Sequence, residues 1–269
     1  MKSFTIALIQ NIPDYDTDKS INRAFEMVEE AARCGAALVS LPEMFYHPFE
    51  LDRLSVLAEY EEVLKVRFSE VARKHSIYLC TGSFVCRGDE GALYNRSFTY
   101  APDGSLLYQY SKCHLFDVAL GKMQVKESAL FAGGAEIGSV DTDIGRLSTL
   151  ICYDIRFPEI ARKVALQGTE VLIVPAVFNQ VTGPVHWELF MRCRAVENQL
   201  FLAAVSQGKN SKSAYQSYGH SMVVTPWGEI LAQAGEGEEI IYAHIDKKIL
   251  EETRRRLPLL ENRRTDIYN

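Results

Sequence analysis

Three residues that could carry out nucleophilic chemistry each follow a short apolar segment of the sequence. Glu43 directly follows "AALVSLP", Lys112 follows "LLYQYS" and Cys152 follows "LSTLI". Segments of this kind are typical of buried strands, and the catalytic groups of α/β proteins tend to lie just beyond strand ends. We therefore expect that an acid, a base and a thiol converge on one pocket.

Together these three side chains would supply the parts of a covalent hydrolysis. A cysteine is a good nucleophile only as the thiolate, so that it needs a nearby base or positive charge. Glu43 would accept the thiol proton and later donate it to a leaving amine. Lys112 would stabilise the oxyanion that forms at an attacked carbonyl, and the backbone N–H of Tyr153 would be a second donor at a sharp strand-to-helix turn.

Each of the three residues also has a plainer interpretation when it is taken alone. Cys152 could be a buried structural thiol, since free cysteine is among the most buried residue types. Glu43 could be a surface carboxylate or a helix cap, and Lys112 a solvated charge. Only the set favours catalysis, and the spacing alone does not show that the three side chains meet.

The elements that must position these residues alternate between strands and helices. The apolar periodicity predicts helices over residues 17–34, 61–75, 153–167, 185–199 and 247–257, with Gly35 as the C-terminal cap of the first. Strands are predicted at residues 4–10, 36–43, 78–84, 146–152, 170–176, 200–206, 219–233 and 238–246. A Pro-Asp-Gly turn joins residues 95–104 to 106–112 as a hairpin. Helices alternating with strands, with hairpins interspersed, favour an α/β fold with mixed sheets.

The overall composition bounds the class of protein. The 269 residues contain no linker-like tract and no internal repeat, which favours one domain over residues 1–269. A net charge of -6 argues against nucleic acid as a partner, and the absence of a signal peptide or of a long apolar run argues against export and membrane insertion. The six cysteines show no metal-binding spacing. We expect reduced thiols in a cytoplasmic protein.

Three motifs around the candidate residues resemble the signatures of the nitrilase superfamily of carbon–nitrogen hydrolases. They are "LPEMF" around Glu43, "YSKCHLFD" around Lys112 and "ICYDIRFPE" around Cys152, in the order typical of that family. Cys113 departs from the pattern, because a larger aliphatic or polar residue is commoner after the lysine. The similarity extends from "IALIQ" to "RRTDIY", along nearly the whole chain.

This resemblance implies both a fold and a site. The fold would be an α-β-β-α sandwich that pairs with a second subunit, with the C-terminal tail, about residues 255–269, packed on that partner. The site would be a Glu-Lys-Cys triad that requires neither a metal nor an organic cofactor. "GKMQVKES" places Glu127 where the family often has a further glutamate, which would orient Lys112 and the substrate nitrogen.

Other segments resemble one branch of the superfamily, the ω-amidases. These are "HLFDVALGKMQVKES", "FNQVTGPVHWELFMRCRAVENQ" and "YGHSMVVTPWGEILAQAG". That branch hydrolyses small-molecule amides such as 2-oxoglutaramate and 2-oxosuccinamate. The branch that acts on deaminated glutathione shares part of the same segments, and N-carbamoyl amino-acid hydrolases are more distant. Both stay open as alternatives.

An anionic substrate needs a cationic receptor, and Arg156 lies four residues after Cys152. Its guanidinium could grip a carboxylate with two hydrogen bonds, although an ion pair with Asp154 or Glu159 is an equal alternative. Thr182, His186 and Trp187 could line the pocket. Trp187 could instead be packing, because Leu189, Cys193, Val196 and Leu200 recur on the same helix at core spacing.

Two further interpretations of the sequence place Cys152 outside a Glu-Lys-Cys triad. A papain-like hydrolase would pair Cys152 with His186 or His220, but it leaves the Glu43 and Lys112 motifs unexplained. A non-catalytic scaffold of the same fold would be favoured by the loss of a triad residue, and all three residues are present.

Overall fold

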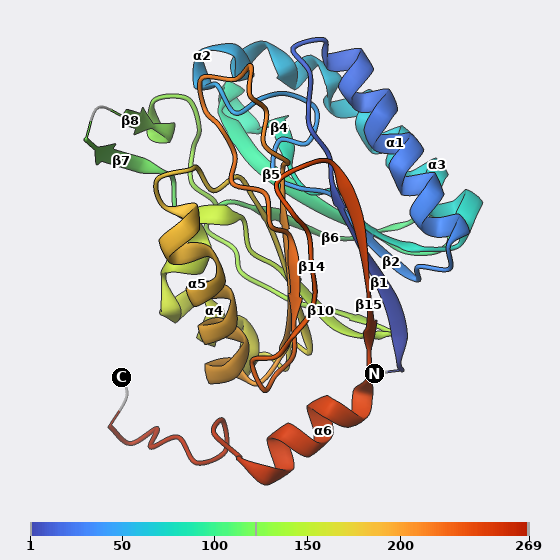
Figure 1. The fold of residues 1–269 in the computed structure, drawn as a ribbon, viewed down its shortest axis with the longest axis vertical. Coiled ribbons are helices and arrows are strands. Elements are labelled where there is room, and N and C mark those ends of the chain that lie inside the picture. The colour runs from blue at the N-terminus through green and yellow to red at the C-terminus, as the bar shows by residue number, and fades with distance from the viewer. Residues whose placement is uncertain (1, 122, 268–269) are drawn as a thin grey trace.

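Two mixed β-sheets packed face to face form the centre of the molecule, and helices cover both outer sides (Figure 1). The computed structural model describes residues 2–121 and 123–267. In the first sheet the strand order is β15-β1-β2-β3-β5-β4, with β6 paired to β5. Its strands are β1 (Phe4–Gln10), β2 (Leu38–Ser40), β3 (Tyr78–Cys80), β4 (Phe84–Arg87), β5 (Leu93–Tyr100), β6 (Leu106–Ser111) and β15 (Glu239–Ile245).

The second sheet has the strand order β14-β13-β12-β11-β10-β9. Its strands are β9 (Val140–Thr142), β10 (Gly145–Thr149), β11 (Val171–Ala176), β12 (Phe201–Ser206), β13 (Met222–Val224) and β14 (Ile230–Gln233). In both sheets central parallel strands are flanked by antiparallel ones. The predicted α-β-β-α architecture with mixed sheets is therefore confirmed.

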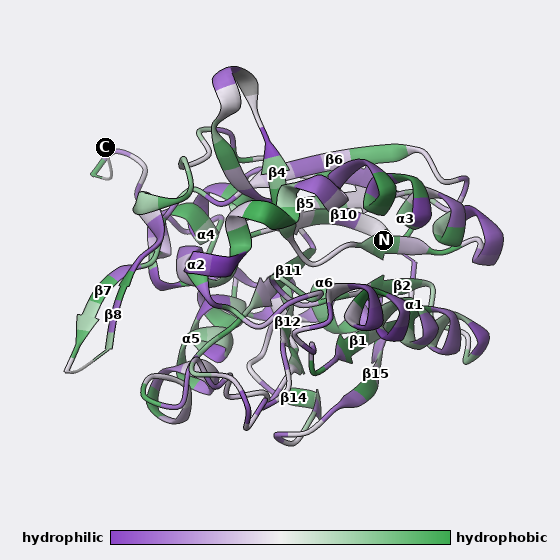
Figure 2. Ribbon diagram, turned by 90° about the horizontal axis from the view of Figure 1, so that it is seen from above, coloured by the Kyte–Doolittle hydropathy of each residue, from purple (hydrophilic) through white to green (hydrophobic). Residues whose placement is uncertain are grey.

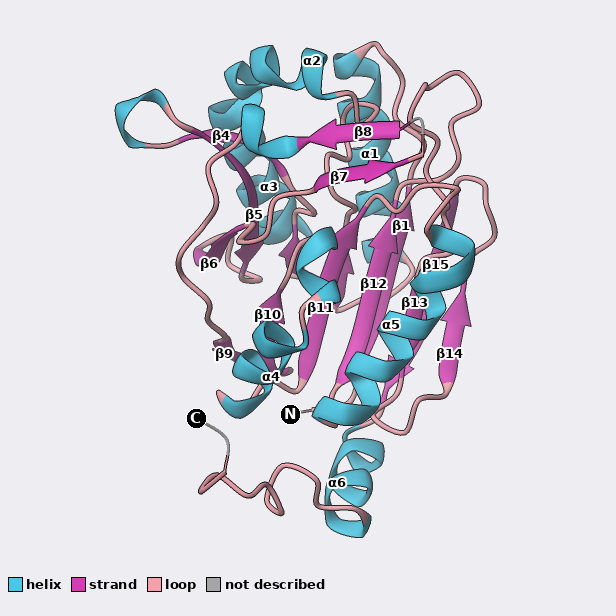
Figure 3. Cartoon of the chain, turned by 90° about the vertical axis from the view of Figure 1, so that its left-hand side faces the viewer, coloured by secondary structure: helices cyan, strands magenta, loops and turns pink. Residues whose placement is uncertain are grey.

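The helices divide between the two outer faces, as Figures 1 and 3 show from two sides. The first sheet carries α1 (Thr17–Arg33), α3 (Glu61–His75), the short α2 (Leu51–Leu54) and the 3₁₀ turn η1 (Ser55–Tyr60). The second sheet carries α4 (Pro158–Leu166) and α5 (Gly183–Asn198). The remaining elements are the 3₁₀ turns η2 (Asp89–Gly91), η3 (Glu127–Ala129) and η4 (Cys152–Arg156), the hairpin β7 (Asp117–Leu120) and β8 (Met123–Lys126), and α6 (Lys247–Arg256).

The alternation of side chains along the strands explains why the core lies in three layers. On β1, Ile6 and Leu8 face the second sheet, whereas Ala7 and Ile9 face the helices. Because both faces of the central strands are buried, these strands are apolar throughout rather than alternating. This two-sided burial fixes the strand ends, and the loops that follow them start from rigid positions.

Local signals account for the ends of several elements. Asp16 caps α1, because its side chain accepts a hydrogen bond from the Lys19 N–H (3.0 Å). Gly35 follows the helix with a φ of 87°, as the sequence predicts. The predicted strand over residues 78–84 is wrong in one respect, because it breaks between β3 and β4. At Gly82 (φ 67°) a Cβ would lie 2.0 Å from the Pro42 carbonyl oxygen, so that only glycine allows this close approach.

Two segments extend away from the sandwich. The hairpin β7–β8, which the sequence did not predict, projects from one side (Figures 1 and 2). At the other end α6 and the residues after it leave the sheets (Figure 1). No helix in the described ranges is long and apolar enough to cross a membrane.

Candidate active site

Glu43, Lys112, Glu127 and Cys152 come together at one end of the sandwich. Lys112 follows β6 and is 1% exposed, and its ammonium donates to Glu43 Oε1 (2.9 Å) and to Glu127 Oε2 (2.8 Å). Glu127 opens the turn after the β7–β8 hairpin, and its Oε2 also accepts from the Phe116 N–H (2.6 Å). One buried cation is therefore shared by two fully buried carboxylates.

The loop that carries Glu43 is held by buried polar contacts on both sides. The Gln207 side chain donates to the carbonyl oxygens of Glu43 (3.0 Å) and Met44 (2.7 Å). On the other side the Met44 N–H donates to Ser83 Oγ (3.3 Å), next to the tight approach at Gly82. These contacts fix the backbone, so that the Glu43 carboxylate is presented in one position.

Cys152 lies at the sharp turn between β10 and η4. Its φ of 48° is unusual for a residue other than glycine, and such strained conformations concentrate at functional sites. The first hydrogen bond of η4 runs from the Asp154 N–H to the Ile151 carbonyl (3.1 Å), so that the Tyr153 N–H has no acceptor within the turn. The Val177 backbone N–H, just after β11, lowers the pKa of the Cys152 thiol, against the larger effect of burial.

Asp154 ties the turn of Cys152 to the strand of Lys112. One of its oxygens accepts from the Ile151 N–H (3.0 Å) and the Tyr110 hydroxyl (2.7 Å), and the other accepts from the His114 N–H (2.8 Å). Tyr110 and His114 flank Lys112 by two residues on each side. The buried Asp154 therefore fixes the two segments relative to each other.

The charges of the cluster shift the acid–base behaviour of its members. Burial raises the pKa of Glu43 and Glu127 raises it further, whereas Lys112 lowers it. Burial alone would lower the pKa of Lys112, but Glu127 and Glu43 outweigh it and raise that pKa well above its usual value. Burial and Glu43 raise the pKa of Cys152, which keeps the thiol protonated until a base removes its proton.

Arg156 has no carboxylate partner in the described part of the chain. Its guanidinium contacts His186 Nδ1 (3.0 Å) and lies over the rings of Phe178 (4.5 Å) and Phe190 (5.2 Å). The described residues form no ion pair of Arg156 with Asp154 or Glu159, and Asp154 accepts from the Ile151 and His114 N–H groups instead. Desolvation by burial lowers the pKa of Arg156. Among the residues that the structure describes, this half-buried cation has no countercharge.

The other residues predicted to line the pocket lie in different surroundings. Trp187 is completely buried, and its Nε1–H donates to the His220 carbonyl (2.6 Å); it packs in the same core cluster as Cys152, which agrees with the alternative of a packing residue. Thr182 is 7% exposed, and its hydroxyl donates to Asn179 Oδ1 (3.2 Å) at the start of α5. His186 contacts Arg156, and the Tyr153 ring packs edge-on against Phe157.

Several residues near the cluster were missed from the sequence. Asn95 on β5 donates from Nδ2 to Glu43 Oε1 (2.7 Å) and Glu127 Oε1 (3.3 Å). The Tyr215 hydroxyl donates to the Val177 carbonyl (2.9 Å) and lies within electrostatic range of Cys152. The alternation along β5, the strand before the Pro-Asp-Gly turn, could have placed Asn95 on the face of Lys112. Nothing in the sequence indicated Tyr215.

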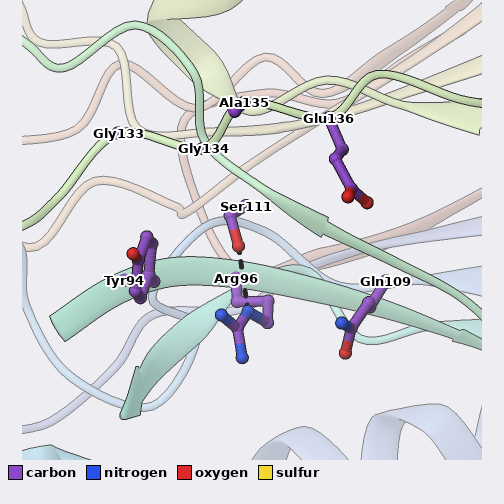
Figure 4. Close-up of a pocket in the computed structure, with 8 residues that line it drawn as sticks. All are labelled: Tyr94, Arg96, Gln109, Ser111, Gly133, Gly134, Ala135 and Glu136. Carbon is purple, nitrogen blue, oxygen red and sulfur yellow. Dashed lines mark hydrogen bonds between the residues drawn. The ribbon is translucent and has the colours of Figure 1, made fainter. Parts of the chain in front are cut away.

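Two cavities lie close to these elements. One of about 390 Å³ lies between β8, the start of α2 and Tyr215, and its lining includes Lys126, the residue before Glu127. The other, about 310 Å³, lies on the opposite face of β5 and β6, where Arg96 Nε donates to Ser111 Oγ (2.9 Å) (Figure 4). Arg96 and Ser111 are the direct neighbours of Asn95 and Lys112, so that the two strands present different chemistry on their two faces.

Comparison with known proteins decides the family. The family model described as "Carbon-nitrogen hydrolase" matches residues 5–255. The chain belongs to the carbon–nitrogen hydrolase family. It is thus an enzyme that hydrolyses carbon–nitrogen bonds, and the predicted resemblance to the nitrilase superfamily is confirmed.

Three members of this family illustrate the similarity. The Homo sapiens protein named Omega-amidase NIT2 is 43% identical over 274 residues, covering 100% of this chain and 98% of that one. Saccharomyces cerevisiae Nit3, described as a member of branch 10 of the nitrilase superfamily, has a TM-score of 0.90 at 36% identity, covering 98% of this chain and 97% of that one. The C. elegans NitFhit protein has a TM-score of 0.93 at 35% identity, covering 100% of this chain and 67% of that one.

Proposed function

We propose that this carbon–nitrogen hydrolase is an ω-amidase, which hydrolyses the terminal amide of a short 2-oxo dicarboxylic acid monoamide such as 2-oxoglutaramate or 2-oxosuccinamate. The observation that carries the proposal is the pairing of a buried Glu-Lys-Glu cluster beside Cys152 with an uncompensated guanidinium at Arg156. The cluster supports amide hydrolysis, and Arg156 supports a substrate that bears a carboxylate. The similarity to Omega-amidase NIT2 over the full chain favours the same branch.

The first half-reaction would form a thioester. Glu43 takes the proton of the Cys152 thiol while the sulfur attacks the amide carbon, and the carbonyl electron pair moves to oxygen. The Lys112 ammonium and the Tyr153 N–H stabilise the oxyanion. When the tetrahedral intermediate collapses, the carbon–nitrogen bond breaks and ammonia leaves with the proton from Glu43. The raised pKa of Glu43 suits a carboxyl that must hold this proton.

The second half-reaction would release the acid. Glu43 removes a proton from water, and the resulting hydroxide attacks the thioester carbon. The carbon–sulfur bond then breaks, and the thiolate takes the proton back. Glu127 would hold Lys112 in place through both steps, since its two oxygens contact the ammonium at 3.0 and 2.8 Å.

The test is ammonia release from 2-oxoglutaramate, deaminated glutathione and an N-carbamoyl amino acid, with Cys152→Ala as the control. We expect preference for 2-oxoglutaramate, lost in the variant, while the variant still binds substrate. Preference for deaminated glutathione would reject the substrate and keep the triad. If the wild-type enzyme releases no ammonia from any of the three compounds, the proposed substrate class is rejected, while the fold and the family stand.

A papain-like mechanism is the alternative that histidine substitutions test. In the described residues His186 contacts Arg156, and the His220 ring nitrogen contacts the Tyr218 carbonyl oxygen (2.8 Å). We expect Glu43→Gln to abolish turnover and His220→Ala to retain it. The reverse pattern would favour a cysteine–histidine pair.

We further propose that the protein is a homodimer that acts in the cytoplasm. Leu189, Val196 and Cys193, which the helical spacing placed in the core, are exposed on the outer side of α5 instead, because the opposite side of the helix packs on the sheet. Together with Val185 (62% exposed) they form an apolar stripe suited to a second copy. The tail after Leu259 runs away from its own sandwich (Figure 1), which supports docking on that copy.

The cytoplasmic location rests on the unpaired cysteines.

Sedimentation of Leu189→Lys tests the dimer, with Val56→Lys as the matched control. Both residues are 64% exposed, but Val56 lies in η1 on the other outer face. We expect Leu189→Lys to sediment as a monomer and Val56→Lys as a dimer. A dimer that survives Leu189→Lys would reject α5 as the interface.

A further inference from the structure

Asn95 is the neutral side chain that contacts both carboxylates of the cluster. It is 1% exposed on β5, and its Nδ2 lies 2.7 Å from Glu43 Oε1 and 3.3 Å from Glu127 Oε1. Nδ2 carries two hydrogens, so that it can serve one carboxylate with each. The three motifs around Glu43, Lys112 and Cys152 do not include this residue.

The charge balance of the cluster explains why a neutral donor is needed there. Two carboxylates share the single positive charge of Lys112, which leaves one excess negative charge in a buried site. The Glu127 charge therefore disfavours the ionised form of the Glu43 carboxyl and raises its pKa. An amide N–H that donates to a carboxylate favours the ionised form without adding charge.

The two carboxylate oxygens of Glu43 differ in their hydrogen bonds. Oε1 accepts from both Asn95 and Lys112, whereas Oε2 is buried and accepts no hydrogen bond from the described residues. An oxygen without a donor has its lone pairs free for an incoming proton. Oε2 is therefore the atom of Glu43 that is left to take the proton of Cys152.

We propose that Asn95 is a positioning residue of the active site: it holds Glu43 Oε1 so that Oε2 is left to take the proton of Cys152, and its N–H favours the ionised form of the Glu43 carboxylate. The proposal rests on the proposed amidase function. A substitution of the Asn95 side chain should disturb the position of Lys112 little. The Lys112 backbone N–H donates to the Asn95 carbonyl (2.9 Å), and this backbone contact stays intact. On the outer face the Arg96–Ser111 contact joins the same two strands (Figure 4).

Asn95→Leu and Asn95→Ala both remove the N–H donors of the side chain. Leucine is similar in size to asparagine, and alanine is smaller, so that it fits without displacing its neighbours. Ser97→Ala is the matched control, because Ser97 is equally buried two residues along the same face but contacts Cys80 Sγ (3.6 Å) rather than a carboxylate. We expect both Asn95 variants to move the acid limb of kcat/KM upward by about one pH unit, with KM at pH 8 nearly unchanged. The Ser97→Ala control should show the same acid limb of kcat/KM as the wild type.

A second readout separates this proposal from the proposed function. The rate of alkylation of Cys152 by iodoacetamide, corrected with Cys152→Ala for the other thiols, follows the same proton transfer without a substrate. We expect the same upward shift of its acid limb in both Asn95 variants. If the wild-type enzyme releases no ammonia but the alkylation limb shifts, the proposed function fails and the role of Asn95 stands. Two results would overturn the positioning role of Asn95. One is an alkylation rate that falls equally at every pH, and the other is an acid limb that does not move in an Asn95 variant that folds.

Discussion

The two cations of the candidate active site, Lys112 and Arg156, are held in opposite ways. Lys112 is 1% exposed and contacts two carboxylates, so that its charge is compensated within the protein. Arg156 is half-buried against aromatic rings and a histidine and meets no carboxylate in the described chain. This difference supports the proposal that Lys112 takes part in the chemistry and Arg156 in substrate recognition. Lys112 already has its countercharges within the protein, whereas the proposed substrate carboxylate would supply the countercharge of Arg156.

Removal of Lys112 should have the largest effect. Lys112→Met leaves two buried carboxylates without a cation, and breaking a buried pair in this way costs about 3–5 kcal/mol of stability. The loss of an oxyanion donor should also lower kcat by about 10³-fold. Urea unfolding and steady-state kinetics measure the two effects.

A surface pair provides the control for the stability loss. Lys247 contacts Glu251 at 2.9 Å, and the two side chains are 44% and 58% exposed, so that Lys247→Met should cost far less stability than Lys112→Met. The double variant Lys112→Met, Glu127→Gln should recover part of the lost stability, because it removes one uncompensated charge. Equal losses for the two lysines would show that the cluster is not a buried ion network.

Arg156→Gln should affect binding rather than stability. Without the guanidinium, a carboxylate-bearing amide loses charge-assisted hydrogen bonds, and we expect its KM to rise roughly 10- to 100-fold. An uncharged short amide should be hydrolysed nearly as before, and the free energy of unfolding should change little. If the charged and uncharged amides lose activity equally, Arg156 is a structural residue and the contrast with Lys112 fails.

The smallest expected effect is on the pH dependence of stability. The pKa of Cys152 is raised above its ordinary value of 9.0 in the folded protein, so that above pH 9 the unfolded chain loses this proton first. The contribution of the thiol is therefore fully present below pH 9 and is lost as the pH rises toward the folded pKa. We expect the stability difference between wild type and Cys152→Ala to fall by about 1.4 kcal/mol per pH unit above pH 9. A difference that stays constant to pH 10 would contradict the burial of the neutral thiol.

Local patterns predicted much of the fold. The helix expected over residues 61–75 is α3, and the hairpin around the Pro-Asp-Gly turn is β5–β6. Helical periodicity and turn residues act over a few positions, so that they can be recognised without knowledge of the partners. The same patterns failed for Leu189, because spacing shows that a helix has an apolar side but not whether a sheet or a second subunit covers it.

The sequence by itself determined the family, the mixed α/β architecture and the identity of the candidate residues Glu43, Lys112 and Cys152, because motifs and strand ends lie within short stretches of chain. Only the tertiary structure decided which groups meet. The contacts of Asn95 with Glu43 and Glu127 join residues 52 and 32 positions apart, and the missing countercharge of Arg156 depends on where Asp154 finds its donors. Such pairings depend on the packing of distant segments, which no local spacing records.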